Sequence, residues 1–249
     1  MSPPPAATPP TTILIEGPAN APATLVLAHG AGAPMDSPFM AALATGLADQ
    51  GWRVLRFEFP YMARQRLTGR KSAPDALPKL QASFRDTVAN ATAAARPLFI
   101  GGKSLGGRVA SLLVDDLAPA GVRGCLCLGY PFHPPGRPHQ LRTDHLATLA
   151  TPTLILQGER DPFGRREEVD TDALSPKVRV EWLPAGDHSF KPTRASGRTE
   201  ADNWALAVER ADRFCRGLLE GERRRPERWR VMPLAGGSVD PSEGVEPAG

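Results

Sequence analysis

Cysteine is scarce in this 249-residue chain, which has three. An odd number of thiols cannot form a complete set of disulfides, so a disulfide framework is excluded as the basis of the fold. Cys125 and Cys127 alternate within an apolar run, which is typical of buried residues on one face of a strand. Because no further ligand residues lie beside them, the sequence predicts no metal site there. The sequence shows no export signal, so we expect the thiols to be reduced.

Long apolar runs and a strong charge of one sign are also missing. No stretch offers the ~18 consecutive apolar residues that a membrane helix needs. The first ten residues, MSPPPAATPP, lack the basic start and apolar stretch of a secretory signal. The formal net charge is only +3, too small to indicate nucleic-acid binding. We therefore expect a cytoplasmic protein that binds neither membranes nor nucleic acid, with an oligomeric state that the sequence does not set.

The two ends of the chain differ in composition from its middle. Residues 1–10 are rich in proline, alanine and threonine, and are predicted to be disordered. Residues 221–249 mix arginine, proline, glycine and glutamate without periodicity, which predicts a mostly flexible tail. The chain as a whole is 41% hydrophobic, enough to build a core. We expect residues 11–220 to form one domain.

Apolar runs and helical patterns alternate through this domain. Strands are predicted at residues 25–28, 52–59, 98–100, 122–128, 153–157 and 178–183. Helices are predicted from Ser37 and Pro38 onward (a cap and a first helical position), and over about 76–95, 106–117 and about 200–219. This order predicts an α/β fold with a mostly parallel, doubly wound sheet and helices on both faces. The ligand crevice of such a sheet lies outside the carboxyl ends of its strands.

One serine lies in the motif Gly102-Lys103-Ser104-Leu105-Gly106, between a predicted strand and a predicted helix. A nucleophile on so tight a turn needs residues without side chains two positions before it and two after it. The turn lifts the hydroxyl clear of the backbone and sets it at a helix N-terminus, which favours developing negative charge. Because the motif alone also fits a purely structural glycine-rich turn, its partners decide between the two interpretations.

A serine hydroxyl needs a base near neutral pH. His188 follows the last predicted strand, in Gly-Asp-His-Ser-Phe. Asp161 follows the strand at 153–157 and is the expected acid. Glu159 lies nearer that strand and is the alternative, whereas Asp187 is a poorer one because adjacent side chains in a loop seldom face each other. The chain order Ser104, Asp161, His188 is the order of nucleophile, acid and base in α/β-hydrolases.

Acyl transfer also requires two backbone N–H groups that stabilise an oxyanion. One is expected from Leu105, the residue after the nucleophile. The other is expected from the loop that follows the strand at 25–28, where Ala31 is the preferred donor and Gly32 the fallback. His29 opens that loop, and we expect it to brace the loop rather than act as a base.

Four stretches of the chain together resemble a known superfamily: LVLAHGAGAPMDSPFM, FIGGKSLGGRVAS, LILQGERDPFG and GDHSF. They are similar to α/β-hydrolases, and more narrowly to the dienelactone-hydrolase-like branch that includes testis-expressed protein 30 and the non-specific-lethal complex subunit 3. The resemblance covers residues 22–218 and implies an α/β-hydrolase fold with Ser104, Asp161 and His188 as nucleophile, acid and base. Dienelactone hydrolases use cysteine where this chain has Ser104, so dienelactone chemistry is not implied. The chromatin-associated relative implies that some members act as interaction proteins.

Three other functions fit parts of the sequence. A nucleotide-binding P-loop would need glycine where this chain has Pro97. Metal-dependent hydrolysis would use His133, His139 and His145, but no carboxylate lies at helical spacing from them, and we predict neither a metal nor an organic cofactor. The third is a catalytically idle scaffold that binds a partner protein, and it is kept as the alternative function.

The sequence thus predicts a serine hydrolase that cleaves an ester, or a related acyl bond, of a small acyl substrate through an acyl-serine intermediate. About two dozen residues separate the strands at 122–128 and 153–157, which leaves little or no room for a lid domain. Four aromatic residues near strand ends are expected to line the open cleft, namely Tyr130, Phe132, Phe163 and Phe190. An ester is expected because it makes the least demanding leaving group.

Overall fold

A computed structural model of the chain describes residues 12–92 and 96–223. The predicted disordered segment 1–10 and residues 224–249 of the predicted tail lie outside the described residues. Among the helices of the described ranges, none has both the length and the apolar character needed to cross a bilayer.

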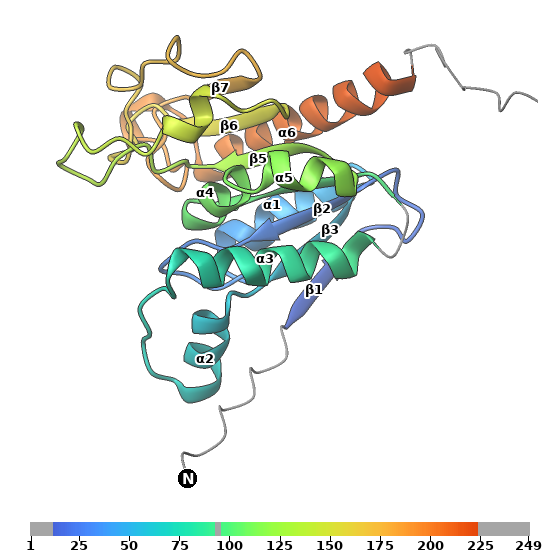
Figure 1. The fold of residues 1–249 in the computed structure, drawn as a ribbon. Helices are drawn as coiled ribbons and strands as arrows, with labels where there is room; N and C mark the ends of the chain where they lie inside the picture. The colour runs from blue at the N-terminus through green and yellow to red at the C-terminus, as the bar shows by residue number, and fades with distance from the viewer. Residues whose placement is uncertain (1–11, 93–95, 224–249) are drawn as a thin grey trace, which may run out of the picture.

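Seven strands form one sheet in the order β1-β3-β2-β4-β5-β6-β7 (Figure 1). β1 pairs antiparallel with β3 at one edge, and all other pairs are parallel. The predicted mostly parallel sheet is therefore confirmed. The strand bounds are β1 Ile13–Glu16, β2 Thr24–Ala28, β3 Arg53–Phe57, β4 Leu98–Lys103, β5 Val122–Leu128, β6 Thr153–Gly158 and β7 Val178–Leu183.

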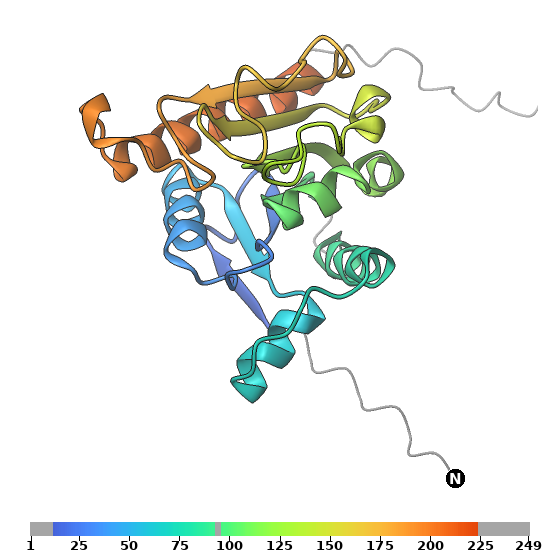
Figure 2. The ribbon, with the colours of Figure 1, turned by 90° about the vertical axis from the view of Figure 1, so that its left-hand side faces the viewer.

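Helices cover both faces of this sheet (Figure 2). On one face, α1 (Pro38–Asp49) packs beside α6 (Glu200–Arg223) over a buried apolar cluster that includes Leu43, Phe99 and Ala211. On the other face, α3 (Leu77–Thr92), α4 (Leu105–Ser111) and α5 (Val114–Leu117) cover a second cluster. The strands between two apolar layers are buried on both sides, which is why they are continuous apolar runs in the sequence.

Several local predictions were wrong. The helix expected at 106–117 is broken after Ser111, whose hydroxyl donates to the Arg108 carbonyl at 2.9 Å, a local bond that competes with the helical pattern. Ser37 stands at the N-cap of α1 but makes no side-chain capping bond. β1 and the helix α2 (Pro60–Thr68) were not predicted. Residues 221–223, predicted as the start of the tail, continue α6.

The segment between β5 and β6 is short. Its one regular element is a 3-10 helix at Asp144–Ala147. The expectation of little or no lid is confirmed: within the described ranges, no separate layer covers the carboxyl ends of the strands.

Candidate active site

A sharp turn carries Ser104 from β4 into α4. Ser104 has φ 50° and ψ −110°, a backbone conformation that a residue with a side chain rarely adopts. A Cβ on Gly102 would lie 2.2 Å from the Ala28 carbonyl oxygen, and one on Gly106 would lie 2.5 Å from the same atom. The flanking glycines are therefore required by the backbone of β2, which passes directly beside the turn.

The loop after β7 holds His188 and is attached to α6. The buried side chain of Asn203 donates to the Phe190 carbonyl at 2.7 Å, and the Trp204 indole donates to the Ser189 carbonyl at 3.0 Å. Phe190 itself has φ 68°. These bonds overcome the cost of the strained backbone and fix the position of His188.

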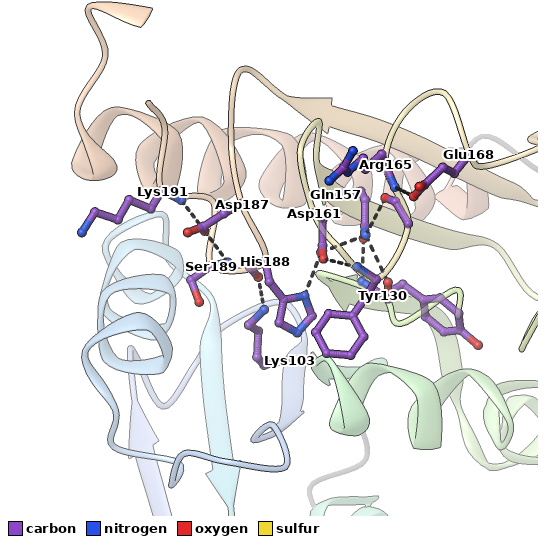
Figure 3. Close-up of polar contacts among 12 residues, drawn as sticks. Lys103, Tyr130, Gln157, Asp161, Arg165, Glu168, Asp187, His188, Ser189 and Lys191 are labelled. Atoms are coloured by element: carbon purple, nitrogen blue, oxygen red, sulfur yellow. Dashed lines mark hydrogen bonds and ion pairs between the residues drawn. The ribbon is translucent and has the colours of Figure 1, made fainter. Parts of the chain in front are cut away.

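Asp161 reaches His188 from the loop after β6 (Figure 3). The imidazole Nδ1 donates to Asp161 Oδ2 at 2.7 Å, and the carboxylate is fully buried. The other carboxylate oxygen accepts from the Phe163 backbone N–H at 2.9 Å. The Phe163 ring lies over the imidazole, with 4.4 Å between ring centroids. The bond from Nδ1 to Asp161 fixes the tautomer of His188 and leaves Nε2 as the nitrogen that can accept a proton.

The two alternative acids face elsewhere. Glu159 accepts from the Ala185 N–H at 2.8 Å and pairs with Arg166 at 3.1 Å. Asp187 accepts from the backbone N–H groups of Ser189 and Lys191, and so closes its own loop. Of the three carboxylates considered, Asp161 is the one in contact with the imidazole.

Gln157, at the end of β6, was missed by the sequence analysis. Its fully buried amide donates to Asp161 Oδ2 at 2.9 Å, to the Tyr130 carbonyl at 3.1 Å and to the Gly164 carbonyl at 3.3 Å (Figure 3). Its oxygen accepts from the Tyr130 N–H at 2.6 Å. A polar residue ending an otherwise apolar strand was the signal that could have identified it.

Ser104 and His188 line one cavity of about 340 Å³, together with Phe163 and residues 30–33. In the described part of the chain, no hydrogen bond joins the Ser104 hydroxyl to the imidazole. Catalytic hydrogen bonds of this kind often tighten only when substrate is bound. A larger cavity of about 660 Å³ lies between α1 and α6 and contains none of the predicted catalytic side chains.

The pKa of His188 lies below its ordinary value. Burial is the largest cause, because it disfavours the charged imidazolium. The hydrogen bond that Nδ1 donates to Asp161 raises the pKa, and the positive charge of Lys103 lowers it. The imidazole is accordingly neutral at pH 7, which is the form a general base requires.

Residues 29–33, here termed the oxyanion loop, are held in place by hydrogen bonds of His29 and Tyr61. His29 Nε2 accepts from the Phe59 N–H at 3.1 Å, so Nδ1 carries the proton and donates to the Gly30 carbonyl at 2.6 Å. The buried Tyr61 hydroxyl lies 3.2 Å from that carbonyl oxygen and 3.1 Å from that of Ala31. His29 therefore braces the loop as expected, and Tyr61, which the sequence analysis missed, adds a second support.

The two expected oxyanion donors lie at the ends of separate elements. Leu105 is the first residue of α4, so its N–H has no partner within the helix. Ala31 lies in the oxyanion loop, where it lines the cavity with Ser104. Among the described groups, neither N–H finds a hydrogen-bond acceptor, which leaves both available to a ligand.

Three of the four aromatic residues expected to line the cleft do not reach it. Phe163 lines the cavity. Tyr130 and Phe132 pack edge to face in the core at 5.0 Å between ring centroids, and Phe190 packs against Phe39 at 5.2 Å. The expectation was wrong for Tyr130, Phe132 and Phe190 because the chain turns inward after each strand and buries the aromatic ring.

Two of the three histidines of the metal alternative, His133 and His145, make separate local contacts. His145 Nε2 lies 2.9 Å from the Ser111 hydroxyl, and His133 Nδ1 lies 2.9 Å from the Pro134 carbonyl oxygen. Within residues 12–92 and 96–223, no three His, Cys, Asp or Glu side chains are grouped to hold a metal ion.

Comparisons with known proteins agree with this fold. The profile of a family described as an alpha/beta hydrolase domain matches residues 21–216. Three solved structures share the fold. Dienelactone hydrolase from Anabaena variabilis is 19% identical, with TM-score 0.64 over 84% of this chain and 92% of that one. An alpha-beta serine hydrolase homologue from Coxiella burnetii is 18% identical, with TM-score 0.62 over 80% and 91%. Est1E from Butyrivibrio proteoclasticus, with ferulic acid bound, is 15% identical, with TM-score 0.63 over 84% and 96%. The chain belongs to the α/β-hydrolase family.

Proposed function

We propose that this protein is a carboxylic ester hydrolase that works through an acyl intermediate on Ser104. The observation that carries the proposal is the bond between buried Asp161 and His188 at the cavity that Ser104 also lines. A nucleophile, a base and an orienting acid from three separate strand ends meet at one edge of the sheet. A turn with only a structural role would not require the other two groups.

The reaction begins when His188 Nε2 takes the proton of the Ser104 hydroxyl as Oγ attacks the ester carbonyl carbon. Asp161 stabilises the imidazolium that forms. The imidazolium then gives its proton to the departing alcohol, and the acyl group remains on Oγ. Water attacks the acyl carbon of this acyl-serine and loses a proton to Nε2. The imidazolium then gives that proton to Oγ as the carbon–Oγ bond breaks, which releases the carboxylic acid and restores the Ser104 hydroxyl and the neutral imidazole.

The oxyanion of each tetrahedral intermediate is held by the N–H groups of Leu105 and Ala31. Preorganised donors of this kind contribute about 3 kcal/mol each to transition-state stabilisation. Leu105 adds the positive end of α4, and the His29 and Tyr61 contacts hold the oxyanion loop ready before substrate arrives.

The cavity favours a small or accessible acyl group. Phe39, Met40 and Phe163 give it apolar walls, and no lid among residues 12–92 and 96–223 separates it from solvent. The ferulic acid bound to the Butyrivibrio esterase is a small aromatic acid, which supports this substrate class. Esters are favoured over amides because alcohols leave more readily. We further propose that, within the family, the chain is related to testis-expressed protein 30 and the non-specific-lethal complex subunit 3, which its GGKSLGGR and GDHSF stretches resemble.

A fluorophosphonate probe tests the proposal, because it labels only an activated serine. The native chain and Ser37→Ala should be labelled, whereas Ser104→Ala should not. Ser37 is the matched control because it lines the same cavity and its side chain makes no capping bond. Hydrolysis of 4-nitrophenyl acetate should follow the same order. A folded native chain that neither takes the label nor cleaves the ester would refute the hydrolase and favour the scaffold.

A further inference from the structure

Lys103 connects the nucleophile turn to the loop of the base. It precedes Ser104 in sequence, and its ammonium group donates a hydrogen bond to the backbone carbonyl of His188 (Figure 3). The side chain is almost completely buried, with 8% relative exposure. Lysine is rarely buried to this extent unless it is paired, so its presence here needs a physical reason.

The ammonium group is held without a carboxylate in contact. In the described part of the chain, Lys103 forms no salt bridge, and its Nζ lies 5.1 Å from the ring centroid of Phe39 and 5.9 Å from that of Phe190. Aromatic faces stabilise a cation but do not neutralise it. The positive charge therefore acts on the titratable groups around it, and the imidazole of His188 is one of them.

Gly129, which follows β5, shows how closely the two groups approach. A Cβ placed on Gly129 would lie 2.7 Å from Lys103 Nζ and 3.3 Å from His188 Nδ1. The two nitrogens are therefore no more than about 6 Å apart. Gly129 has φ 67°, so both conformation and space select glycine there. At this position a side chain would push the ammonium group and the imidazole apart.

We propose that Lys103 is a positioning residue for the base: its ammonium group fixes the backbone of His188 beside Ser104, and its charge adds to burial in disfavouring the imidazolium. The inference rests on the proposed function, since it assigns a role within that mechanism. A neutral residue of similar shape could fill the space, but it would neither repel a proton on His188 nor bind the carbonyl.

The charged groups around Lys103 and His188 act on the pKa of both side chains. Burial lowers the pKa of His188, the bonded Asp161 and the nearby Asp187 raise it, and Lys103 lowers it. Burial also lowers the pKa of Lys103 to about 8, against the opposing charges of Asp161 and Asp187. Lys103 is therefore mostly charged at pH 7 and below, the range in which His188 would otherwise take up a proton.

The decisive measurement is an NMR titration of the His188 imidazole in the native chain, Lys103→Met, Lys103→Arg and Lys191→Met. Two unit charges about 6 Å apart, in surroundings between protein and water, change a pKa by about one unit. Lys103→Met should raise the His188 pKa by that amount. Lys103→Arg keeps the charge and should stay near the native value. Lys191→Met is the control, because it removes an exposed lysine from the same loop.

Kinetics provide the second readout. The ratio of kcat/KM at pH 5 to that at pH 8 should fall up to about tenfold in Lys103→Met, because more of the imidazole is protonated at the lower pH. Lys103→Gln gives the same test if the methionine variant does not fold. An unchanged His188 pKa in a folded neutral variant, or an equal shift in Lys191→Met, would overturn the role of Lys103. Because the titration needs no turnover, its result is independent of Ser104 labelling, which decides the proposed function.

Discussion

Replacing Gln157 by methionine removes the amide that connects the acid to the core while keeping a side chain of similar volume. The Tyr130 N–H loses its acceptor, which costs about 1–3 kcal/mol for a buried donor, and Asp161 loses a charge-assisted bond worth about 1.5–3 kcal/mol. Some of this is recovered by apolar packing, so we expect the free energy of unfolding to fall by about 3 kcal/mol. For a protein of this size, such a loss lowers Tm by about 6–12 °C.

The same substitution should lower kcat/KM about tenfold, because Asp161 becomes free to shift away from His188. Urea unfolding and 4-nitrophenyl acetate hydrolysis, both at pH 7, measure the two effects. Gln140→Met is the matched control, since it makes the same change at an exposed loop position and should alter neither quantity. If the free energy of unfolding of Gln157→Met lies within about 0.5 kcal/mol of the native value, or if the variant hydrolyses the ester at the native rate, the role assigned to this amide is wrong.

Three further changes have defined outcomes. Gly106→Ala places a Cβ 2.5 Å from the Ala28 carbonyl oxygen and should lower the free energy of unfolding in urea by about 3 kcal/mol. The Cβ of Gly32→Ala meets nothing within 4 Å, so this control should leave stability unchanged. Equal stabilities of the two variants would contradict the close approach. Tyr61→Phe frees the oxyanion loop and should lower kcat about tenfold with a loss of only about 1 kcal/mol in stability, an effect that an unchanged kcat would exclude. Burial lowers the pKa of Lys103 from its ordinary 10.5 to about 8, so the unfolded chain holds the extra proton between these values and native stability should rise as the pH increases through them. Lys103→Met should lack this rise, and its free energy of unfolding at pH 7 should exceed that of the native chain by about 2 kcal/mol. Denaturant unfolding at pH 7 and pH 10 measures this, and an equal change in the free energy of unfolding of both chains between the two pH values would refute it.

The main elements of the fold could be predicted because the fully buried strands β2, β4 and β6 are mostly apolar in sequence. β5 and β7 were predicted with the bounds they have in the structure, since turn residues limit both. β1 was missed because it is a four-residue edge strand whose Ile13 and Ile15 remain partly exposed, so it has no apolar face to recognise. α2 was missed because its basic sequence buries only Tyr61 and Met62. Both elements owe their structure to tertiary contacts rather than to local pattern.

The candidate site, too, has residues that could be predicted from the sequence and residues that could not. Ser104, Asp161 and His188 could be selected from their residue types and their places after predicted strands. The supporting residues could not, because Gln157 meets Tyr130 only through the parallel register of β5 and β6. The direction of an aromatic ring after a strand end is likewise set by the turn. That is why Phe163 reaches the cavity while Tyr130, Phe132 and Phe190 are buried.

The attachment of the His188 loop to Asn203 and Trp204 has a consequence for synthesis on the ribosome. The nucleophile turn and the strands beside it are translated long before α6, and such early segments can fold as they emerge. The imidazole, however, has no fixed place until the chain has been extended past Trp204 and the helix has docked. On the proposed function, a nascent chain would therefore carry an unreactive serine, and ester hydrolysis would begin only after nearly all of the described residues had left the exit tunnel.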